Sequence, residues 1–95
     1  QILGETDCSR VFVVRNKLGL HARAAAVFVR VAAKFESDVT ILKDGFEVNG
    51  KSILGVLSLG AINGSEIKVF TRGDDAEEAL DKIGELIDSG FGEGI

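Results

Sequence analysis

The dipeptide Asp44-Gly45 is the feature that most constrains the fold, because it separates two β-like runs, residues 38–43 and 46–49. A two-residue Asp-Gly connection favours a type I′ turn, in which both central residues take positive φ, and this turn joins antiparallel strands. In the first run Val39 and Ile41 lie on one face, which predicts that this face is the better buried. The segment is therefore predicted to form an antiparallel hairpin.

Two further segments are predicted to be strands. Residues 10–15 (RVFVVR) are rich in the β-branched and aromatic side chains that favour extended backbone. Residues 66–72 carry Ile67, Val69 and Thr71 at alternate positions, so these three side chains are predicted to share one face of the sheet.

Three segments have the features of helices. Residues 22–34 place a buried stripe at helical spacing, formed by Ala25, Phe28, Val29, Ala32 and Phe35. A short helix or turn is predicted over residues 52–59, ended by Gly60. The last helix is predicted to begin near residues 73–77, with Asp74 as its cap and Glu77 completing a capping-box-like pair. Its apolar stripe consists of Ala76, Leu80, Ile83 and Ile87.

The resulting order is β-α-β-β-α-β-α, which predicts an α+β open sandwich with helices covering one face of a mainly antiparallel sheet. The length of 95 residues predicts one domain, with residues 1–9 as a flexible lead-in and the Gly-rich residues 89–95 as a flexible tail. The chain contains no methionine, which is consistent with processing, with trimming, or with excision from a longer protein.

Composition excludes several classes of function. The net charge of −4 argues against nucleic-acid binding, and no apolar run approaches the length of a membrane helix. One His and one Cys cannot form the usual nitrogen and sulfur metal site. Cys8, interpreted as an incidental residue of the lead-in, has no internal disulfide partner, which fits a reducing cytoplasm.

His21, the sole histidine, lies where the Gly19-Leu20 turn ends and the helix of residues 22–34 begins. The positive end of the helix dipole disfavours a charged imidazolium, so it is expected to keep His21 neutral and nucleophilic. The same field and the unpaired first-turn amides favour a phosphoryl dianion once the ring carries one. Arg23 is expected on the same turn, where its planar guanidinium suits phosphate oxygens. The simpler alternative is a structural histidine beside a solvated arginine. No second base or closed cleft is indicated, so a complete enzyme is not expected.

Ser52 begins the short helix, so its simplest role is that of an N-cap. As an alternative, phosphorylation of Ser52 would add negative charge beside an apolar surface and alter partner binding. Ile53, Leu54 and Leu57 are the candidates for that surface, and the competing interpretation places all three in the core.

Between about Arg10 and Asp88 the chain resembles the histidine-containing phosphocarrier (HPr) family of the bacterial phosphotransferase system. The resemblance rests on two separated motifs, Gly19-Leu20-His21-Ala22-Arg23 and Asn49-Gly50-Lys51-Ser52-Ile53-Leu54-Gly55, with further matches at 28–29, 58–61 and 73–75. It implies an open-faced β-sandwich with three helices on one side of four antiparallel strands.

The resemblance also implies a function. His21 would be phosphorylated on Nδ1 by enzyme I, which draws on phosphoenolpyruvate, and would pass the group to a IIA-type receiver with the help of Arg23. Ile53, Leu54 and Leu57, with Arg30 at the edge, would dock both partners. Ser52 matches the family's regulatory serine, the target of a kinase/phosphorylase. A cytoplasmic monomer without cofactor is expected.

Ala24 departs from the family pattern, because sugar-transport members usually carry proline there. A small residue other than proline is more similar to the nitrogen-related regulatory branch, whereas Ser52 is typical of members under serine control. Two other functions stay open: a co-regulator of transcription that acts when Ser52 is phosphorylated, and one domain of a larger phosphotransferase.

Overall fold

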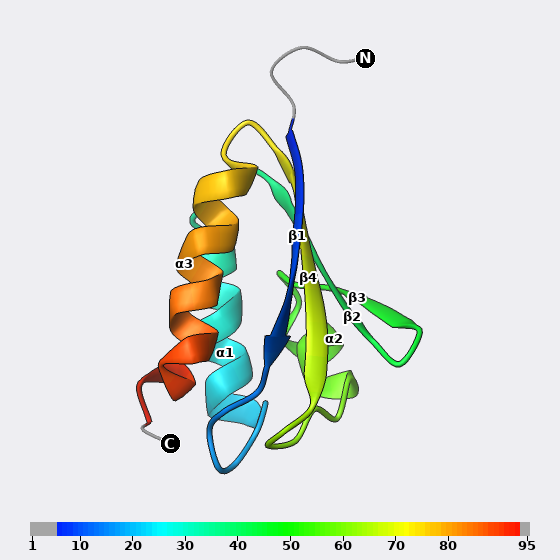
Figure 1. The fold of residues 1–95 in the computed structure, drawn as a ribbon, viewed down its shortest axis with the longest axis vertical. Coiled ribbons are helices and arrows are strands. Elements are labelled where there is room, and N and C mark those ends of the chain that lie inside the picture. Colours follow the sequence, from blue (N-terminus) through cyan, green and yellow to red (C-terminus); the bar gives the residue numbers. More distant parts are fainter. Residues whose placement is uncertain (1–5, 94–95) are drawn as a thin grey trace.

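The computed structural model describes residues 6–93, which fold into a four-stranded sheet and three α-helices (Figure 1). The elements are, in order, β1 (Thr6–Val13), α1 (Ala22–Ala32), β2 (Asp38–Lys43), β3 (Phe46–Asn49), α2 (Ile53–Ser58), β4 (Glu66–Gly73), α3 (Ala76–Asp88) and the short 3-10 helix η1 (Gly90–Gly92). This order confirms the predicted β-α-β-β-α-β-α arrangement and the predicted fold class.

The strands lie in the order β1-β4-β2-β3, and each neighbouring pair is antiparallel. Ile67 and Val69 of β4 are buried beside Phe12 of β1 and Ile41 of β2, and Thr71 shares their face, as predicted. Helices α1 and α3 cover this face of the sheet (Figure 1). Val11 and Val13, which alternate with the buried Phe12 along β1, are exposed. The core therefore lies between the sheet and α1 and α3.

The hairpin between β2 and β3 turns at the predicted dipeptide. Asp44 and Gly45 have φ values of 51° and 81°, as a type I′ turn requires. This turn sets the register in which Lys43 lies opposite Phe46 and Ile41 opposite Val48.

The predicted boundaries of the first strand are wrong. β1 begins at Thr6 and ends at Val13, whereas residues 10–15 were expected to form the strand and residues 1–9 a flexible lead-in. The cause is β4, which extends to Gly73 and provides hydrogen-bonding partners for residues 6–9. Cys8 consequently lies in the sheet, half-buried against the core, instead of in a lead-in. The remainder of that segment, residues 1–5, lies outside the described residues.

The end of α1 also differs from the prediction. The stripe holds for Ala25, Phe28 and Ala32, which are fully buried. The helix ends at Ala32 because the amides of Lys34 and Phe35 each bond to the carbonyl three residues back, which tightens the last turn. Phe35 therefore lies beyond the helix and is half-buried.

The N-cap position of α3 is Asp75, not Asp74 as predicted, and the Asp75 side chain makes no capping hydrogen bond to the helix. The Asp75 carboxylate accepts hydrogen bonds from the Glu36 amide at 3.0 Å, the Ser37 amide at 2.9 Å and the Ser37 hydroxyl. It thus ties the segment before β2 to the start of α3, a tertiary role that local sequence does not indicate. The predicted stripe of Ala76, Leu80, Ile83 and Ile87 is buried.

Within residues 6–93, no helix combines the length and the hydropathy that crossing a membrane requires.

Candidate functional site

His21 is the residue immediately before α1 and forms its N-cap. Its backbone is extended, with φ −76° and ψ 178°, and its carbonyl accepts the first helical hydrogen bond, from the Ala25 amide at 2.8 Å. The imidazole makes no capping bond to the helix, and 28% of the side chain is exposed. The ring is therefore held at the positive end of α1 without being used to terminate it.

Gly19 fixes the loop that leads to His21. It has φ +68°, and a Cβ at this position would lie 2.6 Å from the Ala61 carbonyl oxygen. The next residue, Leu20, donates its amide to the same carbonyl at 2.9 Å and is buried. Only glycine permits this approach, so the Gly19-Leu20 pair anchors the loop against the segment before β4.

The first turn of α1 combines a cationic side chain with unpaired backbone donors. It contains no acidic residue, and Arg23 is exposed two positions after His21. The first amides of any helix lack intrahelical partners. Ala24, which stands where proline was expected from the resemblance, is fully buried and keeps its N–H. The predicted pairing of His21 and Arg23 on one turn thus has the necessary backbone geometry.

A carboxylate from the far end of the chain completes the site. Glu93 Oε2 lies 2.6 Å from His21 Nε2, and its other oxygen, Oε1, accepts a bond from Asn16 Nδ2 at 3.0 Å. Only 15% of the Glu93 side chain is exposed. The sequence analysis missed Glu93 and Asn16, and it placed Glu93 in a flexible tail. No local pattern could have paired residues 72 positions apart.

The tail reaches His21 because η1 turns the chain back after α3. Phe91 is buried and has φ +58°, between Gly90 at +67° and Gly92 at +76°. The chain end drawn in red lies beside the N-terminal end of α1 (Figure 1), and η1 contacts both α1 and α3. The glycines that predicted a frayed tail here permit a compact turn, and the last two residues lie outside the described part.

Electrostatics at the site favour an ionised Glu93. The hydrogen bond from Asn16 is the main reason that the pKa of Glu93 lies below its ordinary value. The bond to His21 and the nearby positive charge of Arg23 lower the pKa further, while partial burial acts in the opposite direction. A carboxylate is thus held against one ring nitrogen of His21.

Asn16 is the buried support of this arrangement. It is fully buried, and its Nδ2 also donates to the Gly19 carbonyl at 2.7 Å. Its Oδ1 has no hydrogen-bond partner among the described residues. Asn16 thus connects the Gly19 turn to the tail carboxylate.

Ser52 takes the role of N-cap of α2, because its Oγ accepts a hydrogen bond from the Gly55 amide at 3.0 Å. The backbone of Ser52 is extended, and its side chain is partly exposed. The preceding Lys51 donates to the Phe35 carbonyl at 2.8 Å. The capping interpretation is confirmed; regulation through Ser52 stays a prediction.

The predicted docking residues are only partly in the core. Leu54 is 80% and Ile53 is 43% exposed, whereas Leu57 is half-buried against the core. Arg30 is exposed in the last turn of α1. Leu18 and Ile62, on the two loops that meet at Gly19, are each 69% exposed and were not predicted. We call Leu18, Ile53, Leu54 and Ile62 the exposed apolar set.

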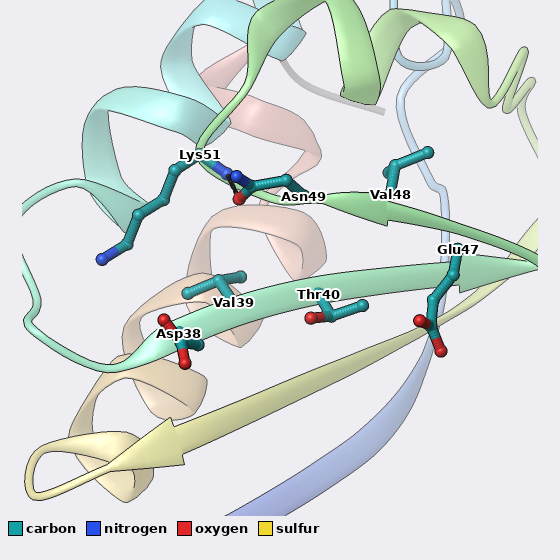
Figure 2. A pocket seen from close by; sticks show the side chains of 7 residues that line it. All are labelled: Asp38, Val39, Thr40, Glu47, Val48, Asn49 and Lys51. Carbon is teal, nitrogen blue, oxygen red and sulfur yellow. Dashed lines mark hydrogen bonds between the residues drawn. The ribbon is translucent and has the colours of Figure 1, made fainter.

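The hollow in Figure 2 is separate from His21. It lies along β2 and β3, has a volume of about 400 Å³ and has Lys51 among its lining residues. Neither His21 nor Arg23 lines it. In the part of the chain that the structure describes, no group of three or more His, Cys, Asp or Glu side chains is arranged to hold a metal ion.

Sequence comparison with known proteins points to one family. Residues 8–89 match the family model described as "PTS HPr component phosphorylation site". The phosphocarrier protein HPr of Neisseria meningitidis is 47% identical over 79 residues, which cover 83% of this chain and 89% of that protein. The HPr-like protein Crh of Bacillus subtilis is 50% identical over 70 residues, or 74% of this chain and 82% of Crh.

A solved structure supports the same relationship. The crystal structure of HPr-C-His from Thermoanaerobacter tengcongensis superposes with a TM-score of 0.89 at 45% identity, covering 93% of this chain and 99% of that one. Sequence, fold and family model agree: the chain belongs to the HPr family of phosphocarrier proteins of the phosphotransferase system.

Proposed function

We propose that this protein is a phosphocarrier that accepts a phosphoryl group on His21 and passes it to a second protein. The observation that carries the proposal is the position of the His21 ring, partly exposed at the N-terminus of α1 and not used as a cap. A ring nitrogen attacks the phosphorus of the donor, and the phosphoryl group moves to His21 as the bond to the donor breaks. Arg23 and the first-turn amides stabilise its negative charge.

The partners follow from the family. The donor is enzyme I, charged by phosphoenolpyruvate, and the receiver is a IIA-type protein, so the carrier is no self-sufficient enzyme and needs no cofactor. We place this exchange in the cytoplasm and expect the carrier to act as a monomer. Incubation with enzyme I and phosphoenolpyruvate is expected to give one acid-labile, base-stable adduct. Uptake of label by a His21→Ala variant would contradict the proposal.

The exposed apolar set, together with Leu57 and Arg30, is the proposed docking surface for both partners. Exposed apolar side chains on the loops beside His21 and on α2 support this assignment. Leu54→Gln is expected to raise the KM of enzyme I for the carrier about tenfold, which corresponds to about 1.4 kcal/mol of lost binding energy, with little change in kcat. Val11→Thr, on the open face of the sheet, is the control. Equal effects of both variants would exclude this surface.

A regulatory role is the second candidate, favoured by the likeness to the HPr-like protein Crh. In this role a kinase/phosphorylase modifies Ser52, two residues before the exposed Leu54. The added charge changes which protein docks there. An acid-stable adduct on Ser52, without labelling of His21 by enzyme I, would favour this role over the carrier.

A further inference from the structure

We propose that Glu93 is a positioning residue for His21: its carboxylate accepts the Nε2 proton and leaves the Nδ1 lone pair free to receive the phosphoryl group. The inference rests on the proposed function and adds a residue to it. It is carried by the 2.6 Å separation of His21 Nε2 and Glu93 Oε2. A neutral imidazole has one N–H and one acceptor nitrogen, so fixing the proton on Nε2 fixes the nucleophile as Nδ1.

The carboxylate is itself held in place. Asn16 Nδ2 donates one hydrogen bond to Glu93 Oε1 at 3.0 Å and a second to the Gly19 carbonyl oxygen at 2.7 Å. Asn16 is fully buried, so its side chain is held in place by the surrounding protein. The chain from the Gly19 turn through Asn16 and Glu93 to the ring therefore sets the orientation of the imidazole as well as its tautomer.

The chemistry requires the proton to stay on Nε2 in both directions of transfer. When the Nδ1 lone pair forms the N–P bond, the ring becomes a cation with its proton still on Nε2, and the adjacent carboxylate pairs with that charge. When the group leaves, the electrons of the N–P bond return to Nδ1 and a neutral imidazole remains. No proton changes place. Loss of the Nε2 proton would make imidazolate the leaving group, and this is a much poorer one.

Arg23 and Glu93 thus serve different parts of the same ring. Arg23 is the cation placed for the phosphoryl oxygens, and Glu93 is the anion placed for the opposite nitrogen. The hydrogen bond from Asn16 is the main cause that lowers the pKa of Glu93, and the charge of Arg23 adds to this effect. This use of a carboxylate to hold a histidine tautomer has the same logic as the aspartate of a serine protease triad.

Nitrogen NMR of the full chain tests the tautomer directly, because His21 is the only histidine and ¹⁵N-histidine labels no other residue. In the unmodified chain at slightly alkaline pH, the neutral Nε2–H tautomer is expected to dominate. Glu93→Ala is expected to lower the ratio of the Nε2–H to the Nδ1–H form roughly three- to tenfold, as the loss of a partly exposed, charge-assisted hydrogen bond predicts. Glu93→Gln keeps an acceptor and should restore part of the ratio. Glu85→Ala, an exposed carboxylate of α3, is the control.

Transfer kinetics provide the second readout. Glu93→Ala is expected to reduce kcat for phosphorylation by enzyme I roughly three- to tenfold, with an unchanged KM, because Glu93 is not part of the exposed apolar set proposed for docking. An unchanged tautomer ratio in Glu93→Ala, while His21 is still phosphorylated, would overturn the inference alone. Absence of label from His21 in the unmodified chain would overturn the proposed function itself.

Discussion

Gly84 of α3 lies directly against the ring of Phe12 on β1. A Cβ at Gly84 would approach two ring carbons of Phe12, Cε1 and Cζ, to 3.0 and 3.1 Å, and both residues are buried. A glycine inside a helix costs about 1 kcal/mol relative to alanine. The close approach of α3 to the sheet explains why this cost is tolerated.

Gly84→Ala is therefore expected to lower the free energy of unfolding by about 1 kcal/mol, because crowding of the Phe12 ring exceeds the gain in helix propensity. Urea denaturation measures this change. In a Phe12→Leu background the crowding is relieved, so the same substitution should become neutral or stabilising. Stabilisation by Gly84→Ala in the otherwise unchanged protein would show that the ring moves aside easily.

Asp75 gives the fold a dependence on acid. The hydrogen bonds from the Ser37 hydroxyl and the Glu36 amide are the main causes that lower the pKa of Asp75 below its ordinary 3.8. A carboxyl whose folded-state pKa is depressed contributes its full stability above its ordinary pKa and loses it as the pH falls through the folded value. Asp75→Asn should thus lower the free energy of unfolding at neutral pH. It should also make that free energy fall less when the pH drops below 3.8. Acid titrations followed by circular dichroism check this, with Asp74→Asn as control.

Ser52→Ala is expected to cost about 1 kcal/mol of stability, because it removes the oxygen that caps the short helix α2. Ser52→Asp keeps a capping oxygen and should retain most of that stability. Ser58→Ala, which removes only an exposed bond to the Gly55 carbonyl, is the control. Thermal unfolding of the three variants gives the comparison. If Ser52→Ala unfolds like the parent protein, the cap contributes nothing measurable, and any loss of function in that variant has a different origin.

Arg23→Ala is expected to slow phosphoryl transfer to His21 roughly ten- to hundredfold, because a charge-assisted contact to the transferred group is lost. Arg23→Lys keeps the positive charge but lacks the planar guanidinium. Its transfer rate is expected to lie between those of Arg23→Ala and the unmodified chain. Rapid-quench measurements with enzyme I give the rates. Lys34→Ala, an exposed cation beyond the C-terminal end of α1, should leave them unchanged. An equal loss in Lys34→Ala would indicate a general effect of net charge.

Much of the fold could be predicted from local patterns. The alternation of Ile67, Val69 and Thr71 and the Asp44-Gly45 turn reflect backbone geometry within one or two elements, and both are confirmed. The start of β1 could not be placed, because residues 6–9 form a strand only through their partners on β4. Asp74 and Asp75 are equivalent as local caps, and the contact with Ser37 distinguishes them.

The candidate site divides in the same way. His21 and Arg23 could be proposed because a helix start and its dipole are local features. Glu93 and Asn16 could not, since their role depends on η1 returning the chain end to α1. The Gly-rich composition of the tail predicted fraying, because composition does not reveal that Phe91 is buried and holds the turn.

Location of the phosphoryl group tests the central claim most directly. The chain labelled with ¹⁵N-histidine is incubated with enzyme I and phosphoenolpyruvate and examined by phosphorus and nitrogen NMR. We predict a phosphorus–nitrogen coupling to Nδ1 of His21 that disappears when a IIA-type receiver is added. A phosphoryl group found on any other residue, Ser52 included, with no coupling to His21, would contradict the account.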